Sequence, residues 1–172
     1  MIISRKFKII EKSKEFVFKK IELREVNKSY VDSLSFAKYL KNKKVHTIGS
    51  QKKYLKNIKK KKNSFILGFF CKKKFLGTVG CQLHKKKIIN KKLYYNVASF
   101  GILVFSGFRN KKFGQLMITS FSKILSDIFN IKMIFATINL KNLMSIKAFK
   151  KSGFILKRKK SNYGLFFFKE NL

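Results

Sequence analysis

The chain has no proline, no tryptophan and only two cysteines, Cys71 and Cys81, in 172 residues. Cys81 and His84 have a Cys-x-x-His spacing. Only Cys71 and His46 remain to complete a metal site, and these two lie far apart in the sequence and form no second pair. We therefore expect neither a structural zinc site nor a disulfide framework, and the few thiols fit a reducing compartment.

Long apolar runs are also missing. None approaches the roughly 18 residues that a membrane-spanning helix needs, and the N-terminus has no separate apolar region followed by a small-residue cleavage site. No Pro- or Ser-rich linker and no internal repeat divides the chain. The sequence therefore predicts a cytoplasmic protein with a single domain over residues 1–172, in which residues 1–13 form an extra strand or a basic arm.

Acidic residues are scarce, since 7 Asp and Glu stand against 42 Lys and Arg, for a formal net charge of +35. An excess of this size indicates an anionic partner such as nucleic acid, the ribosome, an anionic membrane or a phosphorylated substrate. The alternative is mutational drift. Phe, Ile, Lys, Asn and Tyr, which AT-rich genomes encode most readily, are abundant, whereas Arg, which nucleic-acid modules use for bidentate contacts, is rare beside Lys. In both cases the lysines repel one another, so bound anions or salt should stabilise the fold.

The periodicity of apolar residues predicts a mixed α/β fold. Apolar runs predict strands at residues 15–25, 64–71, 75–83, 93–105, 131–138 and 163–169, and helical spacing predicts helices at 29–40, 50–58, 113–128 and 142–151. Ser50 is the expected N-cap of the second helix. The lysine-rich residues 85–92 are expected to form a connection, and Gly153 should end the last helix in the left-handed conformation.

A basic loop at residues 109–114 connects a predicted strand to the helix that begins near Phe113. The N-terminus of a helix presents free N–H groups and partial positive charge, so it can hold phosphate oxygens. Arg109, Lys111 and Lys112 add full positive charges. The loop is not a Walker A loop, because no Gly-Lys-Ser/Thr ends it. It is either a phosphate-binding loop or an ordinary basic connection.

A second motif covers residues 142–154. Asn142, Ser145, Ile146, Phe149, Lys151, Gly153 and Phe154 match the pattern Asn-x-x-Ser/Ala-Ile-x-x-Phe/Tyr-x-Lys-x-Gly-Phe. The basic loop is similar to Gln/Arg-x-x-Gly-x-Gly/Ala, with Arg109 first and Gly114 last. The two segments, in this order and separated by a helix and a strand, resemble the cofactor-binding segments of the GNAT superfamily of acyl-CoA-dependent N-acetyltransferases. The resemblance extends over roughly residues 16–160.

The resemblance implies an α+β fold with a central, mostly antiparallel sheet, a splay between the fourth and fifth predicted strands, and about four flanking helices. Acetyl-CoA, the implied acyl donor, would lie between the strands at 96–105 and 131–138. Its acetyl group would pass directly to a primary amine, with no metal ion and no covalent enzyme intermediate.

The resemblance also implies cofactor-binding residues. The main chain of Ile102, Leu103 and Val104 would lie along the pantetheine arm, and the pyrophosphate would meet Arg109, Asn110, Lys111, Lys112, Phe113, Gly114 and Gln115. Asn142 would lie near the pantetheine, and Phe149 beside the thioester. Lys112 departs from the family pattern, which has glycine there. A non-glycine residue held at positive φ costs on the order of 1 kcal/mol.

Catalytic groups are harder to assign. Phe149 replaces the tyrosine that protonates the leaving thiolate in many relatives, and Ser145 is the implied substitute; alternatively, Ser145 only caps or packs. None of the seven acidic residues falls where some relatives place a base. His46, between the first two helices, is the candidate general base because its ordinary pKa suits the task. A water chain or a plain surface histidine are the alternatives.

The acceptor half resembles a branch of ribosomal-protein N-terminal and amino-sugar acetyltransferases. The residues that carry this resemblance are Leu23-Arg24, Tyr39-Leu40-Lys41-Asn42 with Val45, and Ser50-Gln51 with Tyr54. The expected acceptor is the amine of an amino sugar, nucleotide-linked or not. A protein N-terminus is the alternative, and the rival from another class is a non-catalytic GNAT fold that binds RNA or the ribosome. A monomer or a homodimer is expected.

Overall fold

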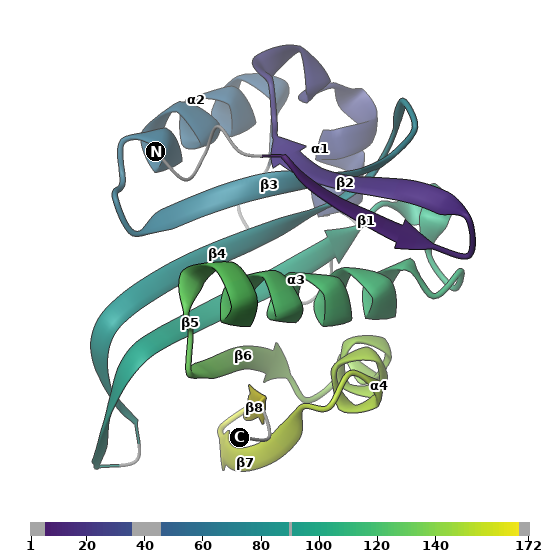
Figure 1. The fold of residues 1–172 in the computed structure, drawn as a ribbon. Coiled ribbons are helices and arrows are strands. Elements are labelled where there is room, and N and C mark those ends of the chain that lie inside the picture. Colours follow the sequence, from purple (N-terminus) through teal and green to yellow (C-terminus); the bar gives the residue numbers. More distant parts are fainter. Residues whose placement is uncertain (1–5, 36–45, 90, 169–172) are drawn as a thin grey trace. The chain divides into compact units, whose positions relative to one another are not determined.

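The structure is a computed structural model that describes residues 6–35, 46–89 and 91–168. The chain forms two compact units. One consists of the residues up to Gly80 together with Ile102–Phe113, and the other of Cys81–Gly101 and the residues from Gly114 onward. Figure 1 shows the helices and strands of both units.

Three strands of the first unit form an antiparallel ladder: β1 (Phe7–Glu11), β2 (Lys14–Lys20) and β3 (Ser64–Cys71). β1 and β2 are joined by Lys12 and Ser13, both at positive φ (48° and 60°), as a two-residue hairpin of the I′ type requires. The extra strand expected near the N-terminus is thus confirmed for residues 7–11.

The strand predicted at 15–25 is too long, because β2 ends at Lys20 and a 3-10 turn follows at Leu23–Glu25. The local sequence favours the turn over the strand. The backbone N–H of Glu22 donates to the Glu25 carboxylate at 2.8 Å, and the N–H of Glu25 donates to the Glu22 carbonyl at 3.0 Å. These two hydrogen bonds between Glu22 and Glu25 stabilise a tight turn.

Two helices belong to the first unit, α1 (Lys28–Ser35) and α2 (Ile48–Lys59). The part of the first predicted helix beyond Ser35 lies outside the described residues. Thr47 is the N-cap of α2, and the prediction of Ser50 as its cap is wrong. Thr47 Oγ1 accepts from the Ser50 N–H at 3.1 Å, while Ser50 Oγ accepts from the Thr47 N–H at 2.9 Å. Ser50 lies three residues after Thr47 and is therefore the second residue of a capping box.

The core of the first unit joins α1 and α2 to the end of β5. Its buried members are Ile21, Val26, Tyr30, Val31, Leu55 and Phe105, with Leu103 and Phe75 among the half-buried side chains around them. The Phe105 ring lies 4.7 Å from Phe75 and 5.7 Å from Tyr30, centroid to centroid, in edge-to-face geometry in both cases. The loop that follows β5 therefore begins at a buried core residue, Phe105.

The long strands β4 (Lys74–Ile89) and β5 (Lys92–Val104) run through both units. The connection predicted at 85–92 is wrong, because β4 continues to Ile89. One lysine of this stretch contacts an aromatic ring through its ammonium group. Lys87 Nζ lies 4.4 Å from the centroid of the Phe135 ring.

The rest of the second unit contains α3 (Phe113–Phe129, whose first residue belongs to the first unit), β6 (Met133–Asn139), α4 (Leu143–Lys151), β7 (Ile155–Lys160) and β8 (Tyr163–Phe168). The sequence did not predict β7. Its residues Leu156 to Lys160 are a basic run without apolar alternation, and only antiparallel pairing with β8 makes it a strand. Gly153, at φ +87°, ends α4 as predicted.

The hydrogen-bonded strand order is β1-β2-β3-β4-β5-β6-β8-β7. β5 and β6 pair in parallel, over Val97–Ser99 and Met133–Phe135. This ladder covers three residues of each strand, although β6 continues to Asn139, in keeping with the expected splay. The predicted α+β fold with a mostly antiparallel sheet and four α-helices is thus confirmed for the part of the chain that the structure describes.

Candidate active site

The loop after β5 has the backbone that a phosphate-binding loop needs. A 3-10 turn at Ser106–Phe108 leads to Arg109, which is extended, and both Asn110 and Lys112 have positive φ (61° and 62°). The positive φ expected at Lys112 is confirmed. The one at Asn110 was not predicted, although Asn enters the left-handed region more readily than most residues. Turns of this kind aim successive N–H groups at one point, where an anion can bind.

Two basic side chains of the loop donate hydrogen bonds to backbone carbonyl groups a few residues earlier in the chain. Arg109 Nε donates to the Val104 carbonyl oxygen at 3.3 Å, and Lys111 Nζ donates to the Gly107 carbonyl oxygen at 3.2 Å. Arg109, Lys111 and Lys112 are nevertheless exposed. Their positive charge at the start of α3 fits the diphosphate of an acyl-CoA, because helix N-termini and cations both favour anions.

Ile102, Leu103 and Val104 are the last three residues of β5. The next residue, Phe105, is anchored by a hydrogen bond from its N–H to the Leu76 carbonyl oxygen at 3.0 Å. Tyr30 packs against it, and burial raises the pKa of this phenol to about 12, so it stays protonated at neutral pH. The strand end predicted to follow the pantetheine arm is therefore held firmly within the first unit.

In the second unit, Asn142 is the N-cap of α4. Its Oδ1 accepts from the Ser145 N–H at 3.1 Å. Ser145 is half-buried on the first turn of the helix. The structure thus gives the Asn142 side chain a structural task of its own, and it satisfies the backbone of Ser145 without engaging the Ser145 hydroxyl.

Phe149 is 2% exposed and belongs to the aromatic core of the second unit. Its ring lies 4.9 Å from Phe154 and 5.8 Å from Phe100. Gln115, in the first turns of α3, donates through Nε2 to the Lys151 carbonyl oxygen at the end of α4, at 3.5 Å. Phe149 is therefore a core residue of the second unit.

His46 forms a pair that sequence reasoning did not find. Its Nδ1 lies 2.9 Å from Nε2 of Gln51, which is 7% exposed and so almost fully buried. With the amide nitrogen toward Nδ1, the neutral ring carries its proton on Nε2 and is a hydrogen-bond donor there. If Gln51 turned its amide oxygen toward Nδ1 instead, the ring proton would lie on Nδ1, and His46 Nε2 would be free to accept a proton.

The predicted site residues divide between the two units. His46, Ile102, Leu103, Val104, Arg109, Asn110, Lys111, Lys112 and Phe113 lie in the first, and Gly114, Gln115, Asn142, Ser145 and Phe149 in the second. Among the described residues, no three His, Cys, Asp or Glu side chains are grouped so that they could hold a metal ion. No helix within the described ranges is long and apolar enough to cross a bilayer.

The family model described as acetyltransferase (GNAT) domain matches residues 20–155. The chain belongs to the GNAT acetyltransferase family. It is therefore an acyl-CoA-dependent N-acetyltransferase, and the match covers both the basic loop and α4. No curated protein sequence matches the chain significantly.

Solved structures share the fold at low sequence identity. An uncharacterized protein from Bacillus halodurans has 13% identity and a TM-score of 0.78, with 96% of this chain and 91% of that one covered. Spermidine N-acetyltransferase from Vibrio cholerae, in a dodecameric structure, has 11% identity and a TM-score of 0.68, with 90% and 93% covered. Campylobacter jejuni N-acetyltransferase PseH in complex with acetyl coenzyme A has 12% identity and a TM-score of 0.66, with 91% and 99% covered.

Proposed function

We propose that this GNAT enzyme transfers the acetyl group of acetyl-CoA to the primary amine of a nucleotide-linked amino sugar. The observation that carries the choice of acceptor is electrostatic. The chain has a formal net charge of +35, so it attracts an acceptor that carries phosphate groups and repels one that is a polycation. We further propose that it acts as a monomer or homodimer in the cytoplasm, where the free thiols of Cys71 and Cys81 stay reduced.

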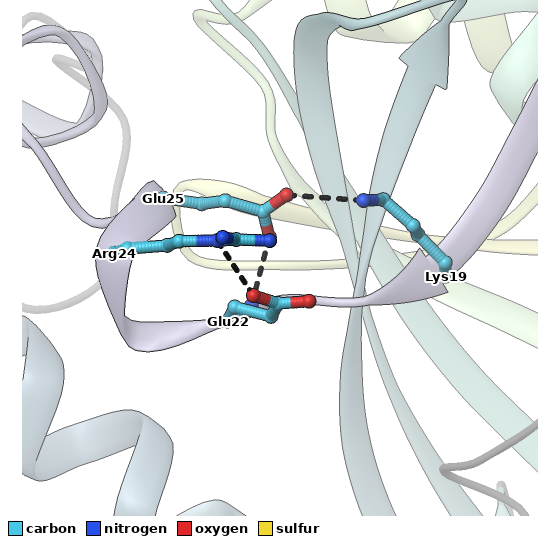
Figure 2. A network of polar contacts seen from close by, with 4 residues as sticks. All are labelled: Lys19, Glu22, Arg24 and Glu25. Atoms are coloured by element: carbon cyan, nitrogen blue, oxygen red, sulfur yellow. Dashed lines mark hydrogen bonds and ion pairs between the residues drawn. The ribbon is translucent and has the colours of Figure 1, made fainter.

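Three carboxylates of the first unit form ion pairs with the protein's own cations. The Glu25 carboxylate lies 3.2 Å from Lys19 Nζ, and the Glu22 carboxylate lies 2.7 Å from Arg24 Nε; Figure 2 draws both contacts as dashed lines. Near the start of the chain, Glu15 pairs with Lys8 at 3.4 Å in the same way. A polyamine needs several carboxylates turned toward one place, and these three are engaged elsewhere. Spermidine, the substrate in the name of the Vibrio cholerae neighbour, is therefore a poor acceptor for this chain.

The proposed reaction is a direct transfer. The neutral amine attacks the thioester carbonyl carbon, the new N–C bond forms as the C–S bond breaks, and CoA leaves as the thiol. Ser145 would donate the proton that the thiolate takes up, directly or through a water molecule. The proton released by the amine would pass to His46, once Gln51 has turned, or to a water chain. The basic loop would hold the pyrophosphate and supply no chemistry of its own.

Binding of acetyl-CoA is tested first. We expect it to raise the thermal midpoint in low salt, because its phosphates meet a loop whose other counter-ions come from solvent. At 100 times the dissociation constant the ligand adds ~2.7 kcal/mol to the free energy of unfolding. A melting curve that millimolar acetyl-CoA leaves unchanged contradicts the assignment of the donor.

The acceptor is tested by release of CoA thiol. UDP-linked amino sugars, spermidine and a peptide with a free N-terminus are compared at equal concentration. We expect the UDP-linked amino sugar to give the highest kcat/KM, and we expect this kcat/KM to fall as salt is added, because salt screens the attraction between unlike charges. The proposed acceptor is contradicted if spermidine gives the higher kcat/KM, or if the kcat/KM of the UDP-linked amino sugar rises with salt. Neither result contradicts the enzyme class.

A further inference from the structure

In the second unit, the hairpin formed by the end of β4 and the start of β5 extends beyond β6. β4 ends at Ile89 and β5 begins at Lys92, so only two residues separate these neighbouring strands. The ladder between β5 and β6 starts at Val97, and Figure 1 shows the end of the hairpin lying past β6. We call residues 85–89 and 91–96 the hairpin arm.

The two faces of the hairpin arm differ in burial. Ile89 is 7% exposed, and Tyr94 packs with it in an apolar cluster of the second unit. Because side chains alternate along a strand, the neighbours of these two residues in the sequence point to the opposite face. Those neighbours are Ile88, Leu93 and Tyr95, which are 71%, 44% and 64% exposed. One face of the arm therefore presents three large side chains to solvent.

The grouping of these three side chains sets them apart from other exposed apolar residues. Ile10 in β1 and Ile155 in β7 are also exposed, at 77% and 60%, and single residues of this kind are common on protein surfaces. The face of the hairpin arm instead gathers three within eight residues of the sequence, on two neighbouring strands. An apolar patch rimmed by charged residues marks an interaction site.

The charge around this face has one sign. Residues 81–101 contain five lysines and neither Asp nor Glu. Lys87 lies over the Phe135 ring, and the other four lysines, Lys85, Lys86, Lys91 and Lys92, are exposed. Two copies of the arm would repel each other, so the charge disfavours a second copy of this chain as the occupant. It favours an anionic partner instead.

The side chains on the face distinguish between anionic partners. A single-stranded nucleic acid stacks its bases on aromatic rings, and only Tyr95 of the three residues is aromatic. Ile88 and Leu93 are aliphatic and suit the acyl chains of lipids. Tyrosine and lysine favour the level of the lipid headgroups, because each has an apolar body and a polar end. Aliphatic side chains with lysines around them are therefore suited to the surface of an anionic bilayer.

We propose that the hairpin arm binds the surface of an anionic lipid bilayer. Ile88 and Leu93 enter the boundary between headgroups and acyl chains, Tyr95 lies at the level of the headgroups, and the exposed lysines contact the anionic groups of the lipids. The contact is reversible and involves one leaflet only. It brings the enzyme to the membrane surface, and it depends neither on the identity of the acceptor nor on the site proposed for acetyl-CoA.

The test measures co-sedimentation with vesicles of phosphatidylserine and phosphatidylcholine. The variant Ile88→Thr/Leu93→Thr is compared with Ile10→Thr/Ile155→Thr, which removes two exposed isoleucines elsewhere. Neither variant changes the charge, and threonine keeps the preference for strands. We expect the wild type and the control to bind alike. The hairpin variant should bind about tenfold more weakly or worse, a factor that burial of one such side chain can supply.

Equal binding of all three proteins shows attraction by net charge alone and overturns the inference. The same holds if the hairpin variant loses affinity for a single-stranded RNA oligonucleotide but not for the vesicles. If circular dichroism shows that this variant does not fold, hydrogen exchange of the wild type decides. The amides of the hairpin arm should exchange more slowly on the anionic vesicles, and protection confined to other parts of the chain overturns the inference. None of these results bears on acetyl-CoA binding, so the proposed function is tested separately.

Discussion

The two segments expected to hold the cofactor, residues 105–114 and 142–154, keep the family pattern in different ways. In the first, Lys112 replaces a glycine, yet the backbone keeps the positive φ that glycine would adopt. In the second, Gly153 is retained at its positive φ, and Asn142 caps the helix that it begins. Phe149 keeps the bulk of the family's tyrosine without its hydroxyl.

This difference separates two kinds of conservation in one molecule. The first segment has the backbone conformation without the glycine at position 112, so we expect any cofactor contact there to depend on N–H directions and on charge. The second matches the family pattern in residue type, and at position 149 it has phenylalanine, which packs in the core but carries no hydroxyl group. A change in the first segment should therefore alter binding, and a change in the second should alter stability or turnover.

The largest expected effect is on stability, from Phe149→Ala. The side chain is almost fully buried and packs on Phe100 and Phe154. Removing it leaves a cavity, and we expect the free energy of unfolding to fall by about 3–5 kcal/mol, measured by urea denaturation. A loss below about 1 kcal/mol would show that Phe149 is not a core residue.

Phe149→Tyr sharpens the same point. If the ring edge faces the thioester, the added hydroxyl keeps stability and raises kcat. If the hydroxyl is buried among the neighbouring rings, it has no partner, and stability falls by about 1–3 kcal/mol. The two outcomes are distinguished by one melting curve and one rate measurement.

Ser145→Ala should produce a smaller effect, and on turnover alone. Thiolate is a fair leaving group, so we expect kcat to fall by less than the ~10²–10⁴ typical of general acid–base catalysis. The acetyl-CoA dissociation constant should hardly change, because alanine keeps the N–H that Asn142 caps. Asn142→Ala is the control, since it removes the cap and should cost ~1 kcal/mol of stability. Full turnover in Ser145→Ala would reduce Ser145 to a packing residue.

Lys112→Gly should raise the free energy of unfolding by up to about 1 kcal/mol, because glycine relieves the strain of positive φ. If the lysine is tolerated drift, acetyl-CoA affinity holds or improves. If it has become a phosphate ligand, affinity falls and its dependence on salt flattens. No change in affinity or salt slope would mean that residue 112 does not touch the cofactor.

Gly153→Ala is the reverse substitution in the other segment. It places a Cβ at φ +87° and 3.0 Å from an atom of the Phe168 ring, so it should destabilise where Lys112→Gly stabilises. Thermal melts of the two variants, recorded side by side, check the opposite signs.

Features set by nearby residues were predictable from the sequence. The apolar periodicity of residues 113–128 predicted α3, and the motif at 142–154 predicted α4 together with the conformation of Gly153. The resemblance of the basic loop to Gln/Arg-x-x-Gly-x-Gly/Ala predicted the positive φ of Lys112. In each case the information lies within a few residues, because helical spacing, caps and left-handed turns are local properties of the backbone.

Other features were decided only by tertiary structure. The basic run Leu156–Lys160 became a strand through pairing with β8, and residues 85–89 stayed in β4, where Lys87 packs over the Phe135 ring. A Cβ atom on Gly77 would collide with the carbonyl oxygen of Leu103, which lies 26 positions further along the chain. The sequence by itself determined the family, the approximate positions of the helices and the two segments expected to hold the cofactor. The register of strands and the direction of backbone groups were decided by packing between residues far apart in the chain, which no local pattern records.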